Sequence, residues 1–241
     1  MSGRNRSSPD QLALALEDAG VIPDPGGLPV SNEWSAPMLP GDGSAPFDDQ
    51  GWFFEPWWPG IQATVIVADG RIDLITGQMA APLPAFPELL AVADQVRARQ
   101  AVITGTLLVL DTAGRPDAAA LRRRLAEPDD RSGTGAFIAA DLLSRDDRDL
   151  TDLPFAGRRG ALLEVVVDGD RFLASRGLHG EGQTLADAAA SMGIEGISAR
   201  RLDAPWRPGV AAEAWLRAPV VGTTVGPVRP LLVLLQRLPL D

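Results

Sequence analysis

The chain has 241 residues, a formal net charge of −10 and a hydrophobic content of 45%, which suits one domain of ordinary to large size, alone or with a fragment of a second. All 22 basic residues are arginine and cysteine is absent, so the sequence excludes a disulfide framework, a cysteine zinc cluster and a thiol nucleophile. The acidic balance makes strong DNA binding doubtful, because a protein that grips phosphates needs a basic surface.

The first 36 residues are interrupted by proline and glycine, and only residues 10–19 favour a helix, with Asp10 as its N-cap. Residues 1–36 are therefore predicted to form an arm with one short helix. The start has no apolar stretch of signal-peptide length, and the longest late apolar run, residues 231–235, is too short to span a bilayer. We expect a cytoplasmic protein that has no membrane contact.

From Trp52 the pattern becomes rich in strands. Asp-Gly between two apolar runs is a strong hairpin signal, and it occurs at Asp69-Gly70 and again at Asp168-Gly169. The predicted hairpins join residues 61–68 to 71–75 and residues 160–167 to 171–175.

Apolar spacing between the hairpins predicts helices over residues 88–99 and 117–126 and a buried strand over 101–110, and another helix follows at 185–192. The second helix carries Arg122, Arg123 and Arg124, which we expect on a solvated face, because charge runs usually lie there. Antiparallel hairpins interspersed with helices predict an α+β fold.

Several short strings occur in an order and spacing that resemble a known family. They are APML (36–39), GWFFEP (51–56), FPEL (86–89), DTAGRPD (111–117), DLL (141–143), DLTDLP (149–154), IEGI (194–197), RPG (207–209) and WLR (215–217). Together they are similar to the nucleotidyltransferase domain of ATP-dependent DNA ligases, particularly of the bacterial end-joining type. The resemblance covers residues 37–219 and implies a fold of antiparallel sheets with flanking helices.

The nucleophile position departs from the family. A KxDGxR motif there supplies a lysine whose amine attacks the α-phosphate of ATP, and the matching string here reads WWPGIQ (57–62). Trp57 stands in place of the lysine, Pro59 in place of the aspartate and Gln62 in place of the arginine. Indole has no basic lone pair to attack phosphorus, and a neighbouring arginine stays protonated. We therefore predict no catalytic residue.

The other motif positions have also lost their chemistry. The resemblance places Thr104 and Thr106 where the family has the carboxylates that contact ribose and metal, and Ala140 where an aromatic ring stacks on adenine. Glu195 is kept, whereas the lysines expected at Arg200, Arg217 and Pro219 are absent. The vestigial nucleotide site is predicted to comprise Trp57, Gly60, Gln62, Thr106, Ala140, Glu195, Arg200 and Arg217.

These losses predict a pseudoenzyme that uses no cofactor and binds no metal, since metal and lysine together supply several kcal/mol of transition-state stabilisation. ATP and Mg²⁺ are expected only if activity is retained. The favoured function is a non-catalytic scaffold or regulator linked to DNA repair, with a protein partner that the sequence does not identify. The alternative is residual ATP binding or DNA ligase activity.

Two features leave other interpretations open. The sole histidine, His179, could form a phosphoramidate, although an exposed loop histidine is the simpler interpretation. Trp52, Trp57 and Trp58 could form a stacking platform for single-stranded bases or belong to the core. We favour the core, with Trp57 filling the nucleotide pocket.

The end of the chain is interpreted as a second domain that is cut short. Family ligases continue into an OB-fold, and residues 220–224 resemble its first strand, while residues 231–235 could supply another. A complete OB barrel does not fit into residues 220–241. We therefore expect a remnant that packs back on the main domain as one or two strands or leaves an apolar edge for a partner.

Overall fold

The computed structural model describes residues 36–77, 79, 81–220 and 225–240, all within the compact unit formed by Ser31–Asp241. The helix predicted over residues 10–19, and most of the strand predicted over 220–224, lie outside the described residues. No helix in the described part is long and apolar enough to cross a membrane.

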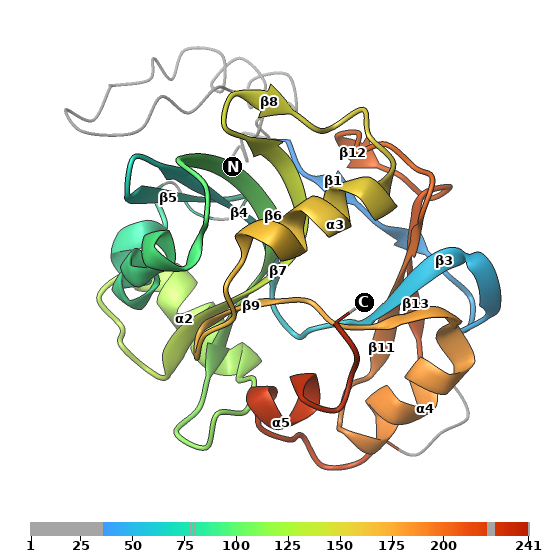
Figure 1. The fold of residues 1–241 in the computed structure, drawn as a ribbon. Helices are drawn as coiled ribbons and strands as arrows, with labels where there is room; N and C mark the ends of the chain where they lie inside the picture. The colour runs from blue at the N-terminus through green and yellow to red at the C-terminus, as the bar shows by residue number, and fades with distance from the viewer. Residues whose placement is uncertain (1–35, 78, 80, 221–224, 241) are drawn as a thin grey trace, which may run out of the picture. The chain divides into compact units, whose positions relative to one another are not determined.

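Two sheets dominate the fold (Figure 1). The first, named here the β3 sheet, has the order β10-β3-β11-β13-β2. Its strands are β2 (Gly41–Asp42), β3 (Asp48–Pro56), β10 (Leu178–Glu181), β11 (Gly196–Arg201) and β13 (Trp215–Pro219). A short parallel pair, β1 (Met38–Leu39) with β12 (Gly209–Val210), forms a separate two-stranded sheet.

The second sheet, named here the β6 sheet, has the order β5-β4-β6-β7-β8, and β9 pairs in parallel with β7. Its strands are β4 (Ile61–Ala68), β5 (Arg71–Thr76), β6 (Gln100–Leu110), β7 (Thr134–Arg145), β8 (Arg148–Asp149) and β9 (Phe172–Ala174). The predicted hairpin at Asp69-Gly70 is confirmed as the β4–β5 turn, where both residues have positive φ. The two sheets and their helices confirm the α+β class.

Helices flank the sheets. They are the 3₁₀ segments η2 (Leu83–Ala85) and η3 (Pro87–Gln95) and the α-helices α2 (Ala118–Ala126), α3 (Phe155–Val165), α4 (Gly182–Ser191) and α5 (Leu231–Leu235). The helix predicted at 117–126 is confirmed, with the Asp117 carboxylate accepting hydrogen bonds from the amides of Ala119 and Ala120. The helix predicted at 88–99 is 3₁₀ and ends at Gln95.

Two predicted strands are wrong. Residues 160–167 lie mostly in α3, whose buried side chains recur at helical spacing through Phe155, Leu162 and Val165. The prediction was wrong because the β-branched residues at the end of this run are typical of a strand. No second hairpin forms, because β9 pairs with β7. Residues 231–235 form α5, which buries Leu231, Leu234 and Leu235 instead of extending as a strand.

The core has two parts, one on each face of the β6 sheet. Alternate residues of β6 and β7 point to opposite faces: Val109 and Phe137 join the cluster under η3, α2 and α3, while Leu108 and Ile138 join the cluster between the two sheets. The second cluster also receives α4 and α5, so residues 225–240 share one core with the main domain. The candidate site lies in the polar gap between the sheets, beside this second cluster.

One arginine of the triplet in α2 is not solvated. Arg124 is 1% exposed, lies 4.8 Å above the Phe86 ring and forms a bidentate pair with Glu88 through 2.5 and 3.0 Å contacts. The expectation of a fully solvated face is wrong at this position, because the helix turns Arg124 toward η3. Arg122 and Arg123 are exposed, as expected.

Acid is expected to weaken this helix contact. Burial alone would raise the pKa of Glu88, but hydrogen bonds from Arg124 and the Gly135 amide, together with the Arg124 charge, outweigh burial and lower the pKa below its ordinary 4.5. A lowered folded-state pKa contributes stability above the unfolded value that is lost as pH falls through the folded value. Urea unfolding should therefore show a smaller loss between pH 7 and pH 4 or below for Glu88→Gln than for wild type. Equal losses would contradict this prediction.

Candidate functional site

A small polar cavity lies between the two sheets. Its lining is contributed by both sheets and by the β3–β4 connection: Glu55, Pro56, Trp57, Trp58, Gln62, Thr106, Ile138, Ala140, Ser175, Ser198, Arg200 and Trp215. The space left among these side chains is about enough for one water molecule. The cavity as it stands does not hold a nucleotide.

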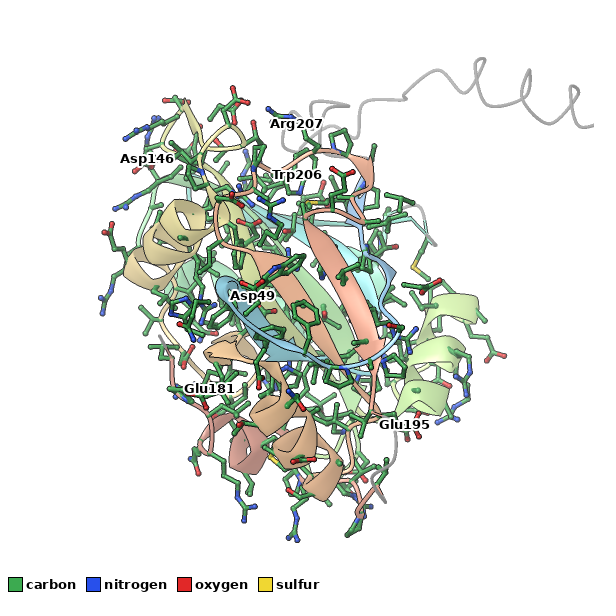
Figure 2. All side chains as sticks on the ribbon, turned by 90° about the vertical axis from the view of Figure 1, so that its right-hand side faces the viewer. Asp49, Asp146, Glu181, Glu195, Trp206 and Arg207 are labelled. Carbon is green, nitrogen blue, oxygen red and sulfur yellow. The ribbon has the colours of Figure 1, made fainter. Side chains whose placement is uncertain are left out.

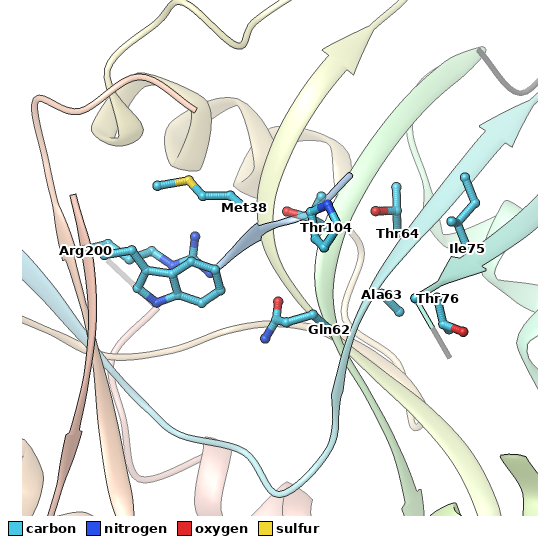
Figure 3. Close-up of a pocket in the computed structure, with 11 residues that line it drawn as sticks. Met38, Gln62, Ala63, Thr64, Ile75, Thr76, Thr104 and Arg200 are labelled. Atoms are coloured by element: carbon cyan, nitrogen blue, oxygen red, sulfur yellow. The ribbon is translucent and has the colours of Figure 1, made fainter. Parts of the chain in front are cut away.

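An adjoining hollow of about 400 Å³, counting the part open to solvent, shares Gln62, Arg200 and Trp215 with the cavity. Figure 3 shows Arg200 on one side of this hollow and Thr64, Ile75 and Thr76 on the other. The polar groups that face the hollow are mainly hydroxyls and one amide, which are weak ligands for a hard metal ion.

Trp57 lies where β3 ends and the chain turns into β4. Its amide donates to the Gly196 carbonyl over 2.9 Å, which ties this turn to the start of β11. The indole is half-buried, with its ring centre 6.4 Å from that of Trp215, and the guanidinium carbon of Arg217 lies 4.8 Å from the Trp57 ring centre. Arg200 in turn lies 3.9 Å from the Trp215 ring. These four side chains form a continuous series of cation–ring and ring–ring contacts, named here the Trp57 stack.

The structure brings most of the predicted site residues together. Five of the eight line the cavity: Trp57, Gln62, Thr106, Ala140 and Arg200. Arg217 is exposed on β13 and covers Trp57 from outside. Gly60 lies in the turn, where an added Cβ would overlap the Leu107 carbonyl, so its role there is close backbone approach. Glu195 is exposed at the edge of the molecule, before β11, and lines neither hollow (Figure 2).

Charge at the cavity is balanced internally. The Arg200 guanidinium lies 4.0 Å from the Glu55 carboxylate and 3.9 Å from the Asp141 carboxylate, and all three groups are buried. Asp141 also forms a bidentate pair with Arg158, at 2.8 Å to each oxygen. Two carboxylates, Glu55 and Asp141, therefore neutralise the two guanidinium groups of Arg158 and Arg200.

Sequence reasoning missed part of the lining. Trp215 and Glu55 stood in strings that resemble the family, but no role was predicted for them. Ser175 and Ser198 could not be predicted as lining residues, because a single serine forms no recognisable sequence motif. In the structure the Ser198 hydroxyl accepts a 2.7 Å hydrogen bond from the Trp215 indole. No group of three or more histidine or acidic side chains able to hold a metal occurs in the described part of the chain.

The alternative nucleophile, His179, is exposed as expected, but it lies in a strand and not in the loop that the sequence suggested. His179 lies on β10, opposite Phe53 of β3, and its Nε2 is 2.7 Å from the Gln50 carbonyl. It is absent from the cavity lining. The three clustered tryptophans differ in burial. Trp58 is 4% exposed and belongs to the core, as the sequence analysis favoured, whereas Trp52 and Trp57 are half-buried.

The two sheets, the helices outside them and the pocket between them define a nucleotidyltransferase-like domain. The family model of the ATP dependent DNA ligase domain matches residues 44–218 of the sequence. The chain therefore belongs to this family. The multifunctional non-homologous end joining DNA repair protein LigD of Mycobacterium tuberculosis is 28% identical over 183 residues, which cover 76% of this chain and 23% of LigD. A probable DNA ligase of Streptomyces avermitilis is 33% identical over 155 residues, covering 57% of this chain and 29% of that protein.

Solved structures of DNA ligases have a similar fold. Mycobacterial DNA ligase D complexed with ATP and MES superposes with a TM-score of 0.66 at 25% identity, over 79% of this chain and 62% of that one. The ligase domain of M. tuberculosis LigD gives a TM-score of 0.65 at 25% identity, over 78% and 60%. The resemblance to the end-joining type of ligase domain is thereby confirmed. The chain spans about a quarter of the length of the LigD proteins it matches.

Proposed function

We propose that this chain is a catalytically inactive member of the ATP-dependent DNA ligase domain family, acting in the cytoplasm as a scaffold or regulatory protein in DNA repair. One observation carries the proposal: Trp57, at the position that the resemblance assigns to the nucleophilic lysine, lies in the Trp57 stack between Arg217 and Trp215. The nitrogen of an indole has no basic lone pair with which to attack phosphorus.

The lining supports the same conclusion. It contains no lysine, cysteine or histidine, and neither Thr104 nor Thr106 offers a carboxylate for Mg²⁺. ATP could enter this cavity only by displacing part of its lining, because the space left there holds about one water molecule. The energy of that rearrangement would count against ATP binding.

The charges on the surface favour a protein partner over DNA. Seven partly exposed arginines have a carboxylate within 4 Å: Arg99, Arg115, Arg123, Arg145, Arg176, Arg201 and Arg207. Acidic side chains such as Asp49, Asp146 and Glu181 are spread over the face in Figure 2. A paired arginine releases few counterions on meeting a phosphate, so these seven side chains add little driving force for DNA binding.

A second candidate function is residual ATP binding. Glu55, Glu195 and Arg200 keep polar or charged groups at positions that resemble family motifs, and two of them line the cavity. This alternative differs from the first in one measurable respect, since a nucleotide that binds only the folded state must raise its stability.

Thermal unfolding with ATP and Mg²⁺ therefore separates the two. A ligand at one hundred times its Kd adds about 2.7 kcal/mol, which for a chain of this size raises Tm by about 5–10 °C. We expect no rise at millimolar ATP, with a lysine-containing ligase domain of the family as the positive control. A saturable rise specific to ATP would favour the second candidate. Affinity capture from the native host would then identify the partner.

A further inference from the structure

Four buried polar atoms around the cavity have no hydrogen-bond partner within the protein. They are Glu55 Oε1, Trp58 Nε1, Ser175 Oγ and Arg200 Nε. Their residues are between 1% and 6% exposed, and all four line the same cavity. Buried polar groups are nearly always hydrogen-bonded, so four such atoms at one small space point to a bound molecule.

The chemistry of the four atoms restricts that molecule. The Trp58 indole and the Arg200 guanidinium can only donate, the Glu55 carboxylate can only accept, and the Ser175 hydroxyl can do either. A metal ion or ammonium would face two N–H donors, and an anion would face the Glu55 carboxylate. A molecule that accepts two hydrogen bonds and donates two satisfies every group.

The size of the space agrees with this requirement, because it holds about one water molecule. We propose that the cavity behind Trp57 is a binding site for one permanently bound water, which accepts from Trp58 and Arg200 and donates to Glu55 and Ser175. This inference does not rest on the proposed loss of catalysis.

The water would join the two sheets. Glu55 and Arg200 belong to β3 and β11 of the β3 sheet, whereas Ser175 directly follows β9, and its amide donates to Ala139 on β7 of the β6 sheet. Trp58 lies in the connection between the sheets. The site therefore bridges the gap between the sheets and helps to hold it closed.

Removing one partner tests the site. Ser175→Ala deletes a hydrogen bond to the water, so we expect Tm to fall by about 2–4 °C. If the hydroxyl were instead an unpaired buried group, its removal would leave Tm unchanged or raise it, and that result would overturn the proposal. Ser144→Ala, at a half-buried serine of β7 outside the cavity lining, is the matched control and should shift Tm by less than about 2 °C.

Crystallography gives a readout that a purely structural role of Ser175 would not give. A crystal structure of the wild type at high resolution should contain a single ordered peak within hydrogen-bond distance of all four atoms. Ser175→Ala should retain the fold while the peak weakens or moves. A wild-type map without such a peak, or with a larger ligand in the cavity, would overturn the proposal.

Discussion

Arg158→Ala is expected to lower the free energy of unfolding by about 3–5 kcal/mol, because it leaves a buried carboxylate without its main partner. Arg158 contacts both oxygens of Asp141 at 2.8 Å and also donates to the carbonyls of Leu153 and Ala204. Asp141 is 0% exposed, and its remaining cation, on Arg200, lies 3.9 Å away. The substitution therefore also disturbs the charge balance at the cavity.

Arg201→Ala is the matched control. Arg201 pairs with Asp203 at 2.7 Å, but the two side chains are 42% and 69% exposed, so the loss of the pair should cost less than about 1 kcal/mol. Urea unfolding of the three proteins measures the difference. Similar losses for the two variants would show that the Arg158–Asp141 pair does not support the site.

Trp57→Lys is expected to lower the free energy of unfolding by about 1–3 kcal/mol and to restore no activity. The substitution removes the ring that contacts Trp215 and places an ammonium beside Arg217, where like charges repel. It supplies an amine but no carboxylate at Thr104 or Thr106, so the metal chemistry stays absent.

Trp57→Phe separates the two effects, because it keeps an aromatic ring beside Trp215 without adding a charge. We expect its loss of stability to be smaller than that of Trp57→Lys. Chemical unfolding and intact-protein mass after incubation with ATP measure both outcomes. A Trp57→Lys protein as stable as wild type would show that the Trp57 ring does not stabilise the closed site. A Trp57→Lys protein that gains covalent AMP would show that the missing carboxylates do not prevent adenylation.

The sequence could predict elements with a strong local signal. Asp69-Gly70 predicted its hairpin and Asp117 predicted the start of α2, because turn and cap chemistry are local. The prediction failed for α3, because the β-branched residues near its end are typical of a strand. In the structure this segment is a helix that packs against β7. β7 itself was not predicted, since it is buried on both faces and lacks alternation.

Some residues of the candidate site could be predicted from the sequence and others could not. The family strings placed Trp57, Gln62, Thr106, Ala140 and Arg200 at one site, and the structure brings these five around one cavity. Ser175 and the partners of Arg200 could not be predicted, because their positions depend on how β9 and β11 meet across the gap between the sheets. The stacking of Arg217 on Trp57 likewise depends on tertiary packing.

The central claim, that this domain does not form the ligase intermediate, is tested most directly by a covalent adenylation assay. Purified protein is incubated with Mg²⁺ and ATP labelled at the α-phosphate, denatured, and measured for retained label, beside a lysine-containing ligase domain of the family. We predict no protein-bound AMP above background. Label approaching one AMP per chain, mapped by peptide mass to any residue of this protein, would contradict the account.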